Sequence, residues 1–75
     1  MHKIQFQIGD GQSFTPSAGT NILKSEEAYV NDITFMKEGG VQLFEGVDYS
    51  RHYTKGLILL NGQKFNSGEK YTITY

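Results

Sequence analysis

The residues most suggestive of chemistry are Asp48, Ser50 and His52, which alternate along one predicted strand. They are the three residue types of a nucleophilic triad. However, side chains at every second position of a strand project in parallel, about 7 Å apart, which is too far for the hydrogen bonds that activate a nucleophile. The only other histidine is His2, and two histidines without cysteine do not complete a zinc site. The sequence therefore predicts no catalytic or metal-binding residues.

Carboxylates are the remaining candidates for acid–base chemistry, and most of them fall in predicted turns. They are Glu26, Glu27, Glu38, Glu45 and Glu69. A general acid and its base need a cleft that moves their pKa values apart, and a minimal domain has little room for one. Asp10, between two glycines, lacks the alternating acidic ligands of a calcium loop. We therefore expect a protein that is not an enzyme and binds no cofactor.

The small size of the chain limits its fold. It has 75 residues and no cysteine. Surface scaling gives a folded area of roughly 4,700 Å² against about 12,000 Å² for the unfolded chain, so only ~60% is buried. Such a core is marginal by itself, and no disulfide reinforces it. We expect one domain over residues 1–75, stabilised by sheet packing, by neighbouring subunits, or by both.

Charge and hydropathy exclude several classes of partner. Seven basic residues balance eight acidic ones, and no basic run is present, so a nucleic-acid partner is not expected. The longest apolar run, residues 57–60, is far shorter than a membrane-spanning helix. The first residues alternate and contain no apolar signal-peptide stretch. We expect no membrane insertion and no signal peptide.

Period-two alternation between glycine-containing turns indicates strands over most of the chain. Strands are predicted over 3–8, 33–37, 41–43, 47–53, 57–60 and 71–75, with weaker candidates at 14–15 and 20–24. Residues 25–31 fit a single helical turn capped by Ser25, or a loop. Because no crossover helix is available, the strands must pair antiparallel. The fold class is therefore all-β, a small antiparallel sandwich or barrel of about seven short strands.

The aromatic residues carry the strongest signal for binding. The chain has ten, more than a core of this size can hold. Alternation places Phe6, Phe35, Tyr49 and Tyr71 inward, whereas Phe44 and Met36 lie off the predicted core faces. Exposed aromatic and methionine side chains are enriched at protein interfaces. The interface candidates are Met36, Phe44, Tyr53 and Tyr75.

The second half of the chain follows an ordered pattern. It consists of a strand, a glycine turn, a short strand ending in Leu, a Gly-x-Asp-Tyr step, a further strand, and a closing Gly-acidic-x-aromatic-x-Ile-x-Tyr segment. These parts read KEGGVQL over 37–43, EGVDY over 45–49, LIL over 57–59, Phe65, and SGEKYTITY over 67–75. Residues 33–75 thereby resemble a module common in tailed-bacteriophage virion proteins, including tail fibres, baseplate-associated proteins and capsid decorations.

The resemblance implies an immunoglobulin-like β-sandwich with a structural or attachment role in the virion. The chain would be synthesised in the host cytoplasm and would dock in multiple copies on a capsid, tail or fibre assembly, as a decoration or adaptor subunit. Fibre modules usually occur as repeats within long chains, whereas this chain begins with Met1 and stops on its last strand. It therefore fits either a whole small subunit or an excised domain.

The distinctive turns of the pattern have a structural interpretation. The residues concerned are Gly46, Asp48, Tyr49 and Gly68. Asp48 is expected to accept backbone N–H groups in the turn after Gly46, while Tyr49 packs inward.

One alternative to virion docking remains at this level, together with one particular mode of docking. A carbohydrate-binding or adhesion module would bind a glycan on Tyr29, Tyr53 or Tyr75, with Gln63 or Asn66 as hydrogen-bonding groups. A β-edge adaptor would pair its exposed first or last strand with another chain.

Overall fold

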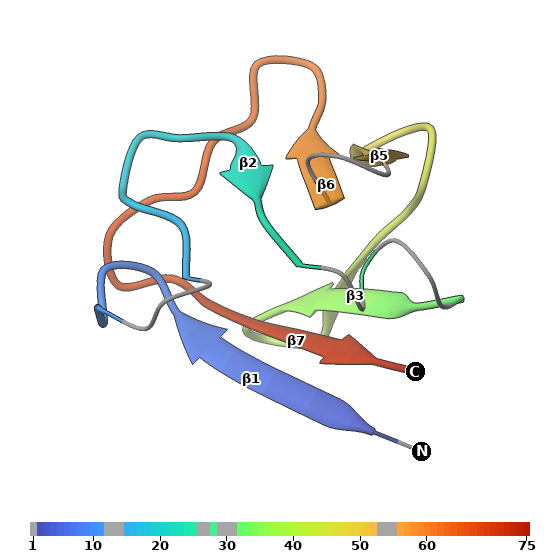
Figure 1. Ribbon diagram of the computed structural model, residues 1–75, viewed down its shortest axis with the longest axis horizontal. Helices are drawn as coiled ribbons and strands as arrows, with labels where there is room; N and C mark the ends of the chain where they lie inside the picture. Colours follow the sequence, from blue (N-terminus) through green and yellow to red (C-terminus); the bar gives the residue numbers. More distant parts are fainter. Residues whose placement is uncertain (1, 12–14, 26–27, 29–31, 53–55) are drawn as a thin grey trace.

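Seven strands in two antiparallel sheets make up the computed structural model, which describes residues 2–11, 15–25, 28, 32–52 and 56–75. The strands are β1 (Lys3–Gln7), β2 (Ile22–Leu23), β3 (Thr34–Lys37), β4 (Val41–Leu43), β5 (Tyr49–His52), β6 (Gly56–Leu59) and β7 (Lys70–Thr74). One sheet has the order β1-β7-β3-β4 and the other β2-β6-β5 (Figure 1). The predicted all-β sandwich of about seven short strands is confirmed.

The sheets are joined by two interlocked strand pairs. The chain passes from β2 in one sheet to β3 in the other, and later from β6 to β7, while β6 pairs with β2 and β7 pairs with β3. Immunoglobulin domains have the same interlocked pairs, with strands B and E as neighbours in one sheet and strands C and F in the other. One strand departs from it: β1 lies beside β7, in the place that the last strand, G, takes in an immunoglobulin domain.

Strand register determines which residues of the four-stranded sheet face the core. Ile4, Ile73, Phe35 and Leu43 lie in one row across all four strands, and the described core includes Ile73, Phe35 and Leu43. The next row lies on the opposite face and contains Gln5, Thr72, Met36 and Gln42. The outer face of this sheet is therefore largely polar.

Aromatic rings fill the space between the sheets. Tyr71 stacks on Phe6 and on Phe35, with ring centroids 5.7 Å and 5.4 Å apart, and meets Phe65 edge-on at 5.1 Å. Phe35 in turn meets Tyr49 edge-on. The four rings predicted to point inward, those of Phe6, Phe35, Tyr49 and Tyr71, are buried. The fully buried Phe65 belongs to the loop between β6 and β7, where no alternation predicts its direction.

Several predicted boundaries differ from the structure. Val47 belongs to a turn, and β5 begins only at Tyr49, because the N–H groups of Val47 and Asp48 donate back to the Phe44 carbonyl. Thr15 forms a bend and not a strand, while Phe14 lies outside the described residues. The Oγ of Ser25 accepts the Ala28 N–H at 3.4 Å, which is the contact of a helix cap, although residues 26–27 and 29–31 lie outside the described part.

The last strand is not exposed at a sheet edge. β7 lies between β1 and β3 and bonds to both. Of the two strands considered for edge pairing, only β1 therefore has a side without a neighbouring strand among the described residues. The prediction of β7 as an exposed edge is therefore wrong. A final alternating segment looks the same in sequence whether it has one neighbour or two, because both faces of the sheet are unchanged.

Gly56, the first residue of β6, lies where no other residue fits. It is buried, and its φ of +86° is a conformation that L-residues rarely adopt. A Cβ atom at this position would lie 2.4 Å from the carbonyl oxygen of Leu23 and 2.7 Å from the amide nitrogen of Ser25. The close approach of two backbones at β2 and β6 therefore depends on this glycine.

Gly56→Ala is expected to lower the free energy of unfolding by about 3 kcal/mol or more, because backbone strain and a backbone clash add together. Gly62→Ala is the matched control. Gly62 also has a positive φ, but a Cβ there meets nothing within 4 Å, so we expect a loss of about 1–2 kcal/mol. Equal losses in urea unfolding would contradict the close approach at Gly56.

Candidate functional site

The turn between β4 and β5 is built around the carbonyl group of Phe44. This carbonyl accepts the N–H groups of Val47 at 3.2 Å and Asp48 at 2.8 Å, and the Gly46 N–H donates to the Tyr49 carbonyl at 2.7 Å. The carboxylate of Asp48 closes the ring, because its Oδ2 accepts the Phe44 N–H at 2.9 Å. The positive φ of Gly46, +84°, lets the chain reverse here. Asp48 and Gly46 thus hold the backbone on both sides of Phe44.

A second set of bonds ties this turn to the loop after β6. The other carboxylate oxygen of Asp48 accepts a hydrogen bond from the side-chain amide of Gln63 at 3.2 Å. The backbone carbonyl of Asp48 accepts the Leu60 N–H at 2.9 Å. Asn61 donates its side-chain amide to the Val47 carbonyl at 2.8 Å. The turn therefore joins both sheets, since β4 belongs to one and β6 to the other.

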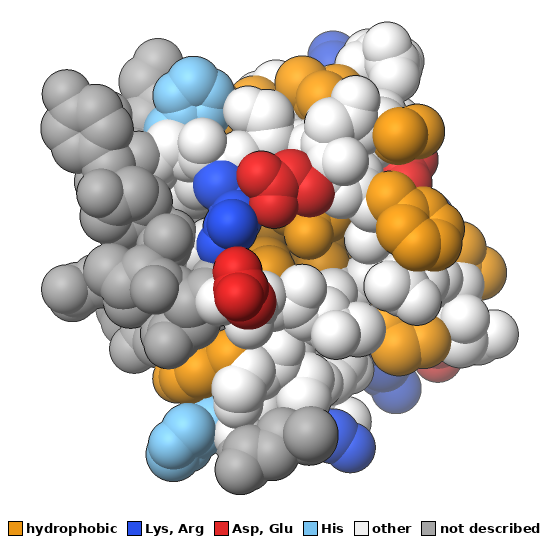
Figure 2. Space-filling view, turned by 90° about the vertical axis from the view of Figure 1, so that its right-hand side faces the viewer, with side chains coloured by type: hydrophobic (Ala, Val, Ile, Leu, Met, Phe, Trp, Pro, Cys, Tyr) orange, Lys and Arg blue, Asp and Glu red, His pale blue; other side chains and the backbone are white. Residues whose placement is uncertain are grey.

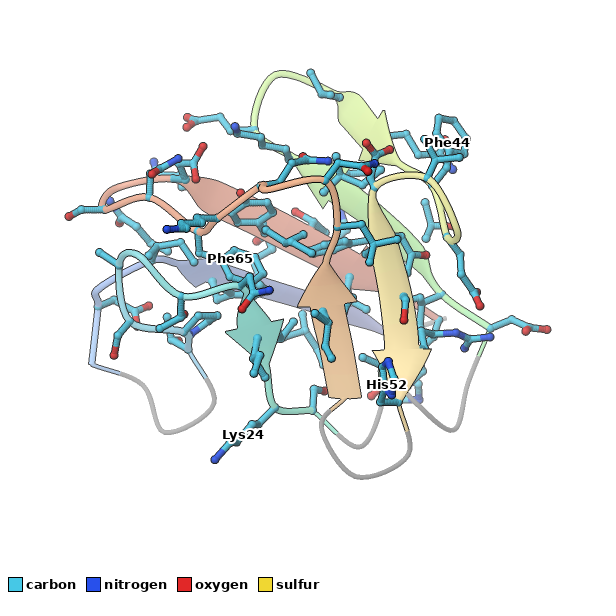
Figure 3. The ribbon with its side chains drawn as sticks, turned by 90° about the horizontal axis from the view of Figure 1, so that it is seen from above. Lys24, Phe44, His52 and Phe65 are labelled. Carbon is cyan, nitrogen blue, oxygen red and sulfur yellow. The ribbon has the colours of Figure 1, made fainter. Side chains whose placement is uncertain are left out.

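Large apolar side chains are exposed on this turn, at Phe44 and Val47, and at Val41 on the preceding strand β4. Val41, Phe44 and Val47 expose 53%, 54% and 59% of their surface, and we call these three residues the apolar patch. Figure 3 shows the Phe44 ring at the margin of the molecule, far from Lys24. In Figure 2, hydrophobic side chains gather on the right-hand part of the face shown. Exposed apolar groups on a well-bonded turn are suited to contact a partner protein without reordering of the backbone.

The other interface candidates do not extend the apolar patch. Met36 is half-buried between Thr72 and Gln42 in the outer row of the four-stranded sheet. Tyr75 packs against the core and contacts the His2 ring, with centroids 5.2 Å apart. Tyr53 lies outside the described residues.

Charged side chains cluster beside the patch, where Figure 2 shows basic and acidic groups in contact. Arg51 Nε lies 3.0 Å from Glu45 Oε1, and an Arg51 terminal nitrogen lies 3.9 Å from Asp32 Oδ1. These ion pairs link β5 to residues on both sides of the β3–β4 hairpin. Burial raises the pKa of the neighbouring Tyr49 phenol, and the negative charge of Glu45 adds to the rise. The Tyr49 hydroxyl is therefore neutral at physiological pH.

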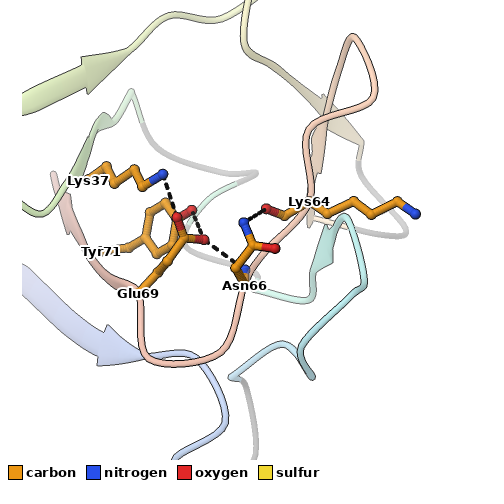
Figure 4. A network of polar contacts seen from close by, with 5 residues as sticks. All are labelled: Lys37, Lys64, Asn66, Glu69 and Tyr71. Atoms are coloured by element: carbon orange, nitrogen blue, oxygen red, sulfur yellow. Dashed lines mark hydrogen bonds and ion pairs between the residues drawn. The ribbon is translucent and has the colours of Figure 1, made fainter.

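A polar network fastens the closing turn to β3 (Figure 4). The Glu69 carboxylate pairs with the Lys37 ammonium and accepts the Asn66 N–H at 2.7 Å and the Tyr71 hydroxyl at 3.1 Å. Partial burial opposes ionisation of Glu69, but the hydrogen bond from Lys37 and those from Asn66 and Tyr71 outweigh it, so the pKa of Glu69 is lowered. Burial and the Glu69 charge raise the pKa of Tyr71. The network links β7, β3 and the preceding loop.

The residues considered for catalysis are not assembled into a site. Asp48 is used in the turn, whereas Ser50 and His52 follow on β5, with His52 exposed. Within the described ranges, no group of three or more His, Cys, Asp or Glu residues is placed to hold a metal ion. No helix among the described residues is long and apolar enough to cross a membrane.

The glycan alternative finds only part of its residues together. Gln63 and Asn66 line one open hollow of about 350 Å³ with Lys37 and Lys64. Tyr75 does not line this hollow. It follows β7 and lies opposite His2, with which it exchanges two backbone hydrogen bonds. Tyr29 and Tyr53 lie outside the described residues. The described residues therefore show amide groups without an accompanying aromatic platform.

Comparison of the chain with models of known protein families, with curated proteins and with solved structures finds no match.

Of the three patch residues, the sequence predicted only Phe44 to lie off the core faces, and its exposure agrees with that. Val47 was expected to begin the strand over 47–53, and Val41 the strand over 41–43. Both are exposed because they lie at the ends of the hairpin and the turn, beyond the cover of the opposite sheet. The glycines at 39–40 and 46 mark these ends, and they are the only feature of the sequence that could have indicated the exposure of Val41 and Val47.

The polar network predicts a pH-dependent contribution to stability. Because the pKa of Glu69 is lowered in the folded state, its contribution is present above the ordinary carboxyl pKa and is lost as pH falls through the folded value. At about pH 7, Glu69→Gln is expected to lower the free energy of unfolding by about 1–2 kcal/mol, since Lys37 loses its partner. The difference from the parent should shrink toward zero at about pH 3 in urea titrations.

The matched control for this prediction is Glu38→Gln, on the exposed hairpin turn. We expect this variant to change stability by less than about 0.5 kcal/mol at either pH. A Glu69→Gln difference that stays constant across the titration would show that the carboxylate charge has no role.

Proposed function

We propose that the chain is a non-enzymatic structural module of a phage-type virion that docks on a capsid, tail or fibre protein through the apolar patch. The observation that carries the proposal is the exposure of Phe44 and Val47 on a turn whose backbone is held by Asp48, with Val41 exposed on the preceding strand β4. A subunit with this marginal core gains stability from a partner that binds only its folded state.

Two further features support this proposal. The interlocked strand pairs are those of the immunoglobulin-like fold that the resemblance of residues 33–75 implies. The residues that carry the resemblance, from Gly46 to Tyr49 and from Gly68 to Tyr75, are also those that build the turn and the polar network beside the patch. Fold alone does not define a function, so the argument rests on the patch.

The geometry of the patch suits a protein partner. Its three side chains are purely apolar, and Arg51, Glu45 and Asp48 supply polar groups nearby. An apolar centre with a polar rim is the usual composition of a protein interface. Because the turn is already ordered by hydrogen bonds, docking would cost little conformational entropy.

The proposal is tested by density-gradient purification of the virions whose genome encodes this chain. We expect the chain to remain with the particles in multiple copies, detected by quantitative mass spectrometry. Phe44→Ser should reduce particle-bound copies about tenfold or more, because an exposed aromatic anchor is lost. Its thermal unfolding should change little, since the ring is already half in solvent.

Lys24→Ser is the matched control. Lys24 is exposed on the loop after β2, away from Phe44 in Figure 3, and its loss should leave particle binding unchanged. The proposal would be wrong if purified particles lack the chain, or if Phe44→Ser and Lys24→Ser bind them equally well.

A further inference from the structure

β1 is an edge strand whose outer side has no neighbouring strand in the part of the chain that the structure describes. Figure 1 shows it at the margin of its sheet, next to β7. At five residues it is longer than the edge strands β4, of three residues, and β2, of two. The edge strands β4 and β5, near the apolar patch, have fewer backbone groups available for pairing. The Phe44 N–H after β4 donates to Asp48, and the Tyr49 carbonyl of β5 accepts the Gly46 N–H.

The hydrogen bonds to β7 show which groups of β1 face outward. His2 exchanges two backbone bonds with Tyr75, and the Ile8 N–H donates to the Glu69 carbonyl. In an antiparallel pair, bonded positions alternate, so the even-numbered residues of β1 bond to β7. The N–H and C=O groups of Lys3, Gln5 and Gln7 therefore point away from β7. Those of Gln7 are used in the following turn, where they contact Asp10.

From this edge we infer that β1 pairs antiparallel with β1 of a second copy of this chain, about a two-fold axis at Ile4. Lys3 then lies opposite Gln5 of the other copy, and the two pairs exchange four backbone hydrogen bonds. The two four-stranded sheets become one continuous sheet. Such a contact is self-complementary and closes after two copies.

Charge and backbone bonding select this register. A two-fold axis at Lys3 would place two lysines directly opposite each other, which is unfavourable. An axis at Gln5 would need the Gln7 backbone groups that already contact Asp10. The axis at Ile4 avoids both. It also brings two half-buried Ile4 side chains together at a non-hydrogen-bonded pair, where strands approach most closely.

This inference goes beyond the proposed function and does not depend on it, because the apolar patch and β1 lie at different edges of the four-stranded sheet. Sedimentation equilibrium of the full chain over a concentration series should give a mass that rises from 8.5 kDa to twice that value. Amide hydrogen exchange at Lys3 and Gln5 should slow with increasing concentration, while exchange at exposed Gln42 on β4 stays constant.

A charge swap tests the register itself. Gln5→Lys places like charges opposite each other twice across the axis, so the dissociation constant of the dimer should rise about tenfold. Adding Lys3→Glu to the same chain converts both contacts into opposite charges and should restore the parent affinity. Gln5 is exposed, so neither variant depends on refolding of the core.

Gln42→Lys is the matched control, since it adds the same charge on the opposite edge of the same sheet. It should leave the dissociation constant unchanged. Three results would each overturn the inference: a mass of 8.5 kDa at every concentration up to about 1 mM, equal effects of Gln5→Lys and Gln42→Lys, or a failure of Lys3→Glu to restore association.

Discussion

The ring and hydroxyl of Tyr71 join several parts of this small domain, which has no cysteine and therefore no disulfide. The ring packs against Phe6, Phe35 and Phe65, which come from two strands and a loop. The hydroxyl donates to Glu69, whose carboxylate also binds Lys37 and the Asn66 backbone. One residue therefore takes part in both the apolar packing and the polar bonding of the closing turn. Because the core is small, this shared role concentrates stability in the centre of the molecule.

The use of one side chain for several contacts also explains how a chain of 75 residues can present a defined surface. Asp48 does at the β4–β5 turn what Glu69 does at the closing turn, since one carboxylate satisfies backbone and side-chain donors from two segments. Turns held in this way do not need burial of their own side chains to be ordered. The apolar residues there are consequently available for contacts outside the domain.

Much of the architecture follows from the sequence because strand faces have a period of two. Alternation alone placed Phe6, Phe35, Tyr49 and Tyr71 in the core, and the absence of a crossover helix required antiparallel sheets. The order of strands within each sheet cannot be predicted in this way, since it depends on which distant strands pair and leaves no local pattern in the sequence. The central position of β7, the burial of Phe65 in a loop and the exposure of Val41 and Val47 all belong to this second kind. The site was therefore predicted only in part, through Phe44 and its turn.

The pairing of His2 with Tyr75 has a mechanical consequence. Because β1 and β7 are antiparallel, the two ends of the described chain lie together at one end of this strand pair. A pulling force applied to both ends would act along the inter-strand hydrogen bonds and break them one pair after another, as in opening a zipper. A force applied between one end and a distant turn would instead load several bonds together. The resistance of this domain to tension is thus set by its points of attachment.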